Sequence, residues 1–145
     1  MSARLLRIVL TLWTLVFVTL GWSQMPESPA KWSAKVEPAT AAPGQRVELV
    51  LTAEIPTPWH LYSLTPIEDG PFPTMIAVKK GGAVAEVGKP VQQKPTRKLD
   101  PNFEKEVEYY EGSAEFRVPI RLSKTASGET KITAGIRFQL CDEGT

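Results

Sequence analysis

Hydrophobic and polar residues alternate along much of this 145-residue chain, in the period-two pattern of half-buried β-strands. Two segments show the pattern best, 46–55 and 114–122, where every second residue is apolar. We expect these apolar sets to face a core: Val47, Leu49, Leu51, Ala53 and Ile55 in the first segment, and Ala114, Phe116, Val118, Ile120 and Leu122 in the second. Val50 is the apolar exception on the predicted solvent face of the first segment.

Shorter segments with the same pattern predict further strands, at 32–36, 59–62, 75–79, 83–87, 107–110 and 131–140. Residues 80–82, Lys-Gly-Gly, indicate a hairpin turn between 75–79 and 83–87. Pro119, inside a long strand, indicates an edge strand or a bulge. Residues 88–105 have no periodicity and are predicted to form a long loop.

No helical periodicity follows the first 23 residues, and short strands separated by turns fill the rest of the chain. This pattern predicts an all-β protein, an antiparallel β-sandwich of immunoglobulin-like type. The inter-sheet disulfide of antibody domains is not possible, because the sequence contains one cysteine.

The N-terminus has the order of a secretory signal. Arg4 and Arg7 precede an apolar run over residues 8–20, and Gly21 and Ser23 are small residues at the cleavage positions. The run is shorter than the ~20 residues of a membrane-spanning helix; an uncleaved anchor is the alternative. We therefore expect a signal peptide over 1–23, a flexible lead-in over 24–30 and one exported domain over 31–145.

Charge and residue counts exclude several functions. The chain has 17 basic and 16 acidic residues and no basic cluster, which argues against a nucleic-acid partner. One histidine and one cysteine are too few for a zinc site. We expect no metal and no cofactor.

The single cysteine, Cys141, ends the closing strand. The apolar set of that strand runs from Ile132 to Leu140, so Cys141 continues the solvent-facing set. An accessible thiol at a strand end can take part in exchange chemistry. The alternative is a buried cysteine that acts as a small hydrophobe. A lone cysteine in an exported protein implies a free thiol, an intermolecular partner, or a partner missing from this chain.

Several short motifs occur in a characteristic order: Trp59-His60-Leu61-Tyr62-Ser63-Leu64-Thr65, Gly70-Pro71-Phe72-Pro73-Thr74, Asp100-Pro101-Asn102-Phe103, Tyr109-Tyr110-Glu111-Gly112, Phe116-Arg117-Val118-Pro119-Ile120 and Phe138-Gln139-Leu140-Cys141-Asp142. From about Trp32 to its end the chain resembles the N-terminal periplasmic domain of DsbD-type thiol:disulfide interchange proteins. The resemblance implies an immunoglobulin-like sandwich whose cysteine pair shuttles between dithiol and disulfide, as part of a protein-disulfide reductase.

In such proteins a transmembrane domain and a thioredoxin-like domain deliver electrons from the cytoplasm. The recipients are thioredoxin-like periplasmic proteins, such as disulfide isomerases and cytochrome c maturation factors. Cys141 matches the first cysteine of the pair, and the second is expected a few residues past Thr145. Either the chain is the front piece of a longer protein, which we favour, or it is a divergent protein with one thiol. Alone, it can attack a disulfide but cannot resolve the product.

The resemblance also assigns residues around the sulfur. Phe103 matches an aromatic loop tip that caps the cysteine pair, with Asp100 and Glu104 as flanking acids. The alternative for Phe103 is a core position beneath a long loop. His60 and Tyr62 match positions that line the cysteine site; the alternative for His60 is a surface histidine with no role.

Asp142 and Glu143 follow the sulfur directly. Like-charge repulsion from these carboxylates would disfavour the thiolate and make the thiol react only when a partner docks. The alternative is two solvated carboxylates in a loop. A function of another class also stays open, an exported immunoglobulin-like binding or adhesion module whose thiol is incidental.

Overall fold

The computed structural model describes residues 27–142. Within that range the regular secondary structure consists of β-strands, with no helix. The predicted signal peptide and Glu143 lie outside the described residues. The strands are β1 (Lys31–Glu37), β2 (Arg46–Ile55), β3 (His60–Tyr62), β4 (Met75–Val78), β5 (Val84–Val87), β6 (Val91–Gln92), β7 (Thr96–Asp100), β8 (Lys105–Tyr110), β9 (Gly112–Leu122), β10 (Ala134–Arg137) and β11 (Leu140–Cys141). The described part contains no helix that could span a membrane.

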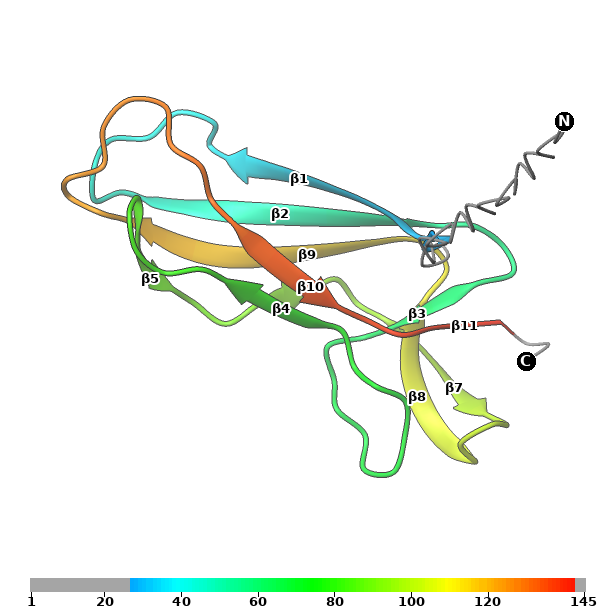
Figure 1. Cartoon of the computed structure of the whole chain (residues 1–145). Coiled ribbons are helices and arrows are strands. Elements are labelled where there is room, and N and C mark those ends of the chain that lie inside the picture. Colours follow the sequence, from blue (N-terminus) through cyan, green and yellow to red (C-terminus); the bar gives the residue numbers. More distant parts are fainter. Residues whose placement is uncertain (1–26, 143–145) are drawn as a thin grey trace, which may run out of the picture.

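The strands form two layers. One layer, here called the long sheet, has the order β1-β2-β9-β5, and β6 also pairs with β9. The other layer consists of a β10–β4 ribbon and a four-stranded sheet in the order β11-β3-β8-β7, here called the end sheet (Figure 1). All strand pairs are antiparallel. The predicted all-β sandwich is confirmed.

The main core lies between the layers and contains the predicted inward sets of β2 and β9, apart from the half-buried Leu122 at its margin. Trp32 of β1 stacks on Phe116 with ring centroids 5.9 Å apart, and its ring is 5.3 Å from that of Phe138. The apolar residues of the predicted closing strand pack against the same core. Alternation along the sequence therefore identified most of this core.

Val50 was predicted to face solvent. It lies on the outer face of the long sheet, as predicted, but it is fully buried (0% exposed). Its cross-strand neighbours are Lys35 and Arg117. The Arg117 guanidinium binds Glu37, Glu48 and Glu115 across this face. Long paired side chains thus cover Val50, as the aliphatic stems of such residues can.

The predicted hairpin at residues 80–82 and the predicted edge or bulge at Pro119 were also wrong. Gly81 and Val84 exchange backbone hydrogen bonds in a tight turn, but β4 pairs with β10 and β5 with β9, so the chain crosses between layers instead of forming a hairpin. Pro119 lies in β9, a central strand of the long sheet. Beside it β5 has ended and β6 has not begun, and its carbonyl accepts a hydrogen bond from Gly88. That gap accommodates a proline without an edge position.

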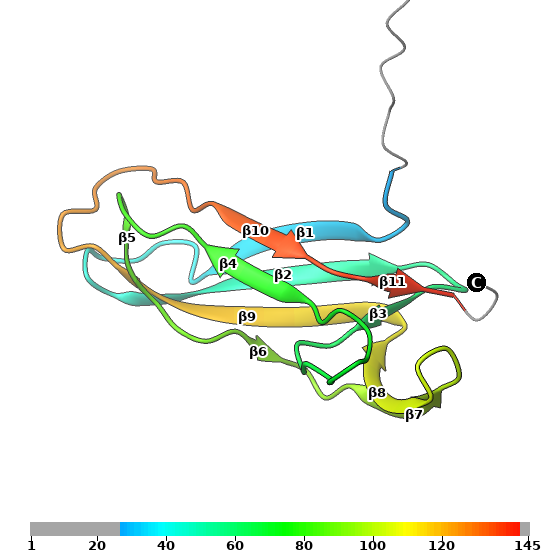
Figure 2. The ribbon, with the colours of Figure 1, turned by 60° about the horizontal axis from the view of Figure 1, so that its bottom comes forward.

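The 88–105 segment and the closing strand differ from prediction as well. The segment contains β6 and β7 instead of only loop. The closing strand divides at Phe138 and Gln139, and its first part pairs with β4 while its second part pairs with β3. Figure 2 shows how β10 and β11 follow each other along the face of the sandwich, so that the chain passes from the β10–β4 ribbon into the end sheet. This division places Cys141 in the end sheet.

Candidate functional site

Cys141 lies at the outer edge of the end sheet. Strand β11 pairs with β3 so that Cys141 faces His60 and Leu140 faces Leu61. The thiol is half-buried, and Cys141 packs against a second cluster of buried residues, Tyr62, Val107 and Tyr109, which is separate from the main core. The sulfur is therefore neither in the main core nor fully in solvent.

The adjacent 101–104 loop and the residue that follows Cys141 each make a polar contact with the sulfur. The side-chain amide of Asn102 donates to Cys141 Sγ at 3.7 Å. The thiol in turn donates to the backbone carbonyl of Asp142 at 3.4 Å. Asn102 was not among the predicted site residues; its place beside Phe103 in the Asp-Pro-Asn-Phe motif is the signal that the sequence offers.

Tyr62 and Asp100 form the buried polar centre beneath this site. The Tyr62 hydroxyl donates to Asp100 Oδ2 at 2.7 Å, and His60 Nε2 lies 3.3 Å from the same hydroxyl. Burial raises the pKa of the Tyr62 phenol well above its ordinary value of 10.0, and Asp100 and Cys141 act in the same direction. The phenol thus stays protonated and remains a donor to the carboxylate.

Asp100 also holds the loop that carries Phe103. It is only 3% exposed, and its Oδ1 accepts a 2.9 Å hydrogen bond from the backbone N–H of Asn102. The carboxylate thereby joins β3 to the 101–104 loop. Phe103 is half-buried in that loop and meets Tyr62 edge to face, with ring centroids 6.2 Å apart. Phe103 and Cys141 therefore pack on the same cluster.

The remaining predicted residues have different positions. His60 is 5% exposed, and its ring lies between those of Tyr62 and Tyr109, with each centroid 5.2 Å away. His60 is therefore buried and not a surface histidine, and its role stays a prediction. Glu104 is exposed, with a φ of 54° where the chain turns back into β8. Asp142 borders the site, and Glu143 lies outside the described residues.

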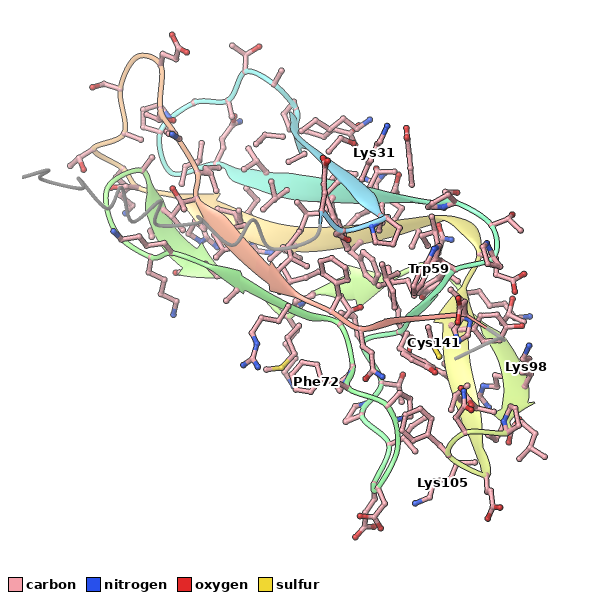
Figure 3. All side chains as sticks on the ribbon, turned by 45° about the vertical axis from the view of Figure 1, so that its right-hand side comes forward. Lys31, Trp59, Phe72, Lys98, Lys105 and Cys141 are labelled. Atoms are coloured by element: carbon pink, nitrogen blue, oxygen red, sulfur yellow. The ribbon has the colours of Figure 1, made fainter. Side chains whose placement is uncertain are left out.

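A pocket of about 410 Å³ opens beside the sulfur. Asn102 and Asp142, which both bond to Sγ, are among the residues that line it. Leu99 lies on its rim and is 67% exposed, the most exposed of the large apolar side chains in the described part of the chain. Figure 3 shows Cys141 and Lys98 at the same end of the molecule. The pocket is lined by His60, Lys98, Leu99, Asp100, Pro101, Asn102 and Asp142.

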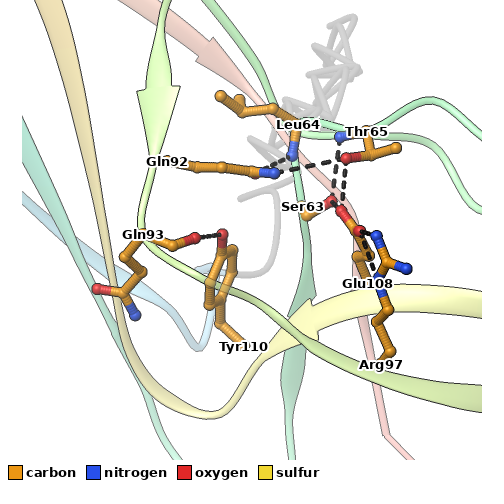
Figure 4. A network of polar contacts seen from close by, with 8 residues as sticks. All are labelled: Ser63, Leu64, Thr65, Gln92, Gln93, Arg97, Glu108 and Tyr110. Carbon is orange, nitrogen blue, oxygen red and sulfur yellow. Dashed lines mark hydrogen bonds and ion pairs between the residues drawn. The ribbon is translucent and has the colours of Figure 1, made fainter.

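A polar network around Glu108 braces the other side of β8 (Figure 4). Its carboxylate accepts from the hydroxyls of Ser63 and Thr65, at 3.2 and 2.5 Å, and pairs with Arg97 of β7 at 2.6 Å. The hydrogen bond from Thr65 and the contacts with Arg97 hold the pKa of Glu108 below its ordinary value, against an opposing effect of burial. The network fixes β7, and with it Asp100, relative to β3.

No group of three or more potential metal-ligating side chains occurs within residues 27–142. The site therefore offers one thiol, an amide donor, a phenol–carboxylate pair and a histidine ring. Among these groups the thiol is the strongest nucleophile once it is ionised.

Comparison with known proteins gives one match. Residues 30–145 match the family model described as thiol:disulfide interchange protein DsbD, N-terminal. No curated protein and no solved structure shows a significant match. The matched family consists of periplasmic thiol:disulfide interchange domains that act with thioredoxin-like partners. Because the match covers far more than half of the chain, this protein belongs to the family of N-terminal domains of the thiol:disulfide interchange protein DsbD.

Proposed function

We propose that Cys141 is the redox-active thiol of this domain, and that the domain passes reducing equivalents from a membrane electron donor to periplasmic disulfide proteins. The observation that carries the proposal is the position of the sulfur, half-buried at the sheet edge on the aromatic cluster that also holds Phe103. Disulfide isomerases and cytochrome c maturation factors are the proposed recipients, and residues 1–23 the proposed export signal.

The reaction follows the ordinary course of thiol–disulfide exchange. The Cys141 thiol loses its proton to solvent, and the thiolate attacks one sulfur of a partner's disulfide. A bond forms between Cys141 and that sulfur while the partner's own S–S bond breaks, and the second partner sulfur leaves as a thiolate and takes up a proton. A second thiol then has to attack the mixed disulfide to release the reduced partner. The 145 residues contain one cysteine, so with this chain alone the mixed disulfide accumulates.

Phe103 is the proposed cap of this thiol. Its ring packs against Tyr62, within the cluster on which Cys141 also lies. An apolar ring beside a reduced sulfur excludes water and small oxidants, and a docking protein can displace it because the 101–104 loop is mostly exposed. The proposed result is a thiol that reacts slowly with small molecules and readily with a docked partner.

The proposal is tested by trapping a partner. A thioredoxin-like protein that keeps only the attacking cysteine of its Cys-x-x-Cys motif is activated with 5-thio-2-nitrobenzoate and mixed with the reduced protein. We expect one nitrobenzoate released per chain and a covalent complex on a non-reducing gel, with neither product from the Cys141→Ser variant. The proposal would be contradicted if the native protein released nitrobenzoate from the activated thioredoxin-like protein no faster than from an activated small thiol, and no covalent complex formed.

A further inference from the structure

We propose that the side-chain amide of Asn102 is a hydrogen-bond donor that stabilises the thiolate of Cys141, and that buried Asp100 positions the loop that carries it. This inference rests on the proposed function, since it assigns a residue that controls how readily the same thiol ionises.

The contact has donor geometry toward the sulfur. Asn102 Nδ2 lies 3.7 Å from Cys141 Sγ, within the range of hydrogen bonds to sulfur. A primary amide has two N–H donors, so one can point at the sulfur while the other faces the pocket. Hydrogen bonds to the charged form of a group favour that form. The amide therefore favours the thiolate over the thiol.

The other groups near the sulfur serve this purpose less well. From β3, the Tyr62 hydroxyl also contacts Cys141, but its single O–H donates to Asp100 at 2.7 Å, and His60 Nε2 lies beside the same hydroxyl. From β8, Tyr109 contributes its ring, over which the Lys98 ammonium lies at 5.4 Å. The two carboxylates on this side, Asp100 and Asp142, carry negative charge, which opposes a thiolate. Asn102 supplies a donor without adding a charge.

The backbone that carries the amide is fixed within the loop. Asp100 Oδ1 accepts the backbone N–H of Asn102 at 2.9 Å, a side-chain-to-backbone bond two residues along the chain that defines an Asx turn. Asp100 is itself fixed by the 2.7 Å bond from Tyr62. Because the backbone of Asn102 is held in place, its amide stays within reach of the sulfur whether the thiol is ionised or not. Asp100 is thus a positioning residue.

The test is the pH dependence of alkylation. Iodoacetamide, which is uncharged, reacts with the thiolate of the folded full chain, and the rate is measured from pH 5 to 11. Asn102→Asp keeps the side-chain shape but removes the donor and adds a negative charge; Asn102→Ala only removes the donor. Gln45→Glu is the matched control, because it makes the same amide-to-carboxylate change at the opposite end of the sandwich, where Gln45 Oε1 accepts from Ala42.

We expect the pH of half-maximal rate to rise by about half a unit in Asn102→Ala and by about one unit in Asn102→Asp. At pH 7 the rates would then fall roughly threefold and tenfold. Gln45→Glu should stay within about 0.2 unit of the wild type. A loosened Phe103 loop would instead raise the limiting rate at high pH without moving the midpoint, so the two effects separate.

Midpoints of both Asn102 variants equal to the wild-type midpoint would overturn the inference. If the wild type then still forms the mixed disulfide described above, the proposed function stands and only the role of Asn102 fails. If the wild-type thiol does not form that complex, the proposed function fails whatever the midpoints are.

Discussion

The hydroxyl of Tyr62 donates a 2.7 Å hydrogen bond to Asp100 Oδ2, across 38 residues of sequence. The bond joins β3, which carries the strand partner of Cys141, to the end of β7, from which the 101–104 loop departs. One buried carboxylate therefore links both sides of the thiol. This arrangement accounts for an acid in the interior, since burying a carboxylate is costly unless donors satisfy it.

Removal of this carboxylate should destabilise the domain. Asp100→Ala leaves the buried Tyr62 hydroxyl and the Asn102 N–H without their acceptor, so we expect a loss of about 1–3 kcal/mol in the free energy of unfolding. Urea unfolding followed by fluorescence measures it. Glu54→Ala is the matched control, because Glu54 is exposed on β2. Equal stability of the two variants would show that the Tyr62–Asp100 bond is not a structural link.

Removal of the Phe103 ring should expose the thiol. We expect Phe103→Ala to speed alkylation of Cys141 by neutral reagents several-fold at every pH, because the ring no longer covers the cluster on which the sulfur lies. Phe72→Ala is the control: that ring packs on Arg137 of β10 instead, with its centroid 5.0 Å from the guanidinium carbon. An unchanged rate in Phe103→Ala would refute the cap but leave the fold as described.

Leu99 should contribute to partner docking. It is highly exposed on the pocket rim, and exposed apolar residues beside a site are typical of protein contacts. We expect Leu99→Ser to slow mixed-disulfide formation with a thioredoxin-like protein about tenfold while alkylation by iodoacetamide is unchanged. Val91→Ser, an equivalent change at a 57% exposed position in the long sheet, should alter neither rate. Parallel loss in both assays would mean that Leu99 affects the thiol itself and not docking.

Glu108 should make stability depend on pH. Its pKa is lowered in the folded state, chiefly by the hydrogen bond from Thr65, so its contribution is present above the unfolded value near 4.5 and is lost as the pH falls through the lower folded value. We expect Glu108→Gln to lose roughly 1 kcal/mol at pH 7 relative to the wild type. The difference should shrink below about pH 4.5 when urea unfolding is repeated at decreasing pH. A difference that stays constant down to pH 3 would contradict this role.

Alternation predicted the sandwich because β2 and β9 each bury one face in a common core. The same rule fails on β7, where the exposed position is Leu99 and the buried one is Asp100. That inversion depends on Tyr62, which pairs with Asp100 only after the chain has folded, and no local pattern records it. For this reason 88–105 was predicted as loop.

The candidate site residues were predicted by resemblance more than by pattern. The order of motifs led to Phe103, Asp100, His60 and Tyr62, and the structure brings the side chains of these four together beside Cys141. It does not describe Glu143, and Glu104 is exposed in its loop. Asn102 was missed because its amide reaches the sulfur only through a turn that Asp100 sets.

The most direct test of the central claim is thiol labelling of the native protein. The folded chain, with no denaturant, is treated with a neutral alkylating reagent, and modification of Cys141 is followed by mass spectrometry alongside unfolding measured on the same sample. The account predicts complete modification while the protein remains folded, and faster modification in Phe103→Ala. Modification that appears only as the protein unfolds would show that the sulfur is a core atom and would contradict the account.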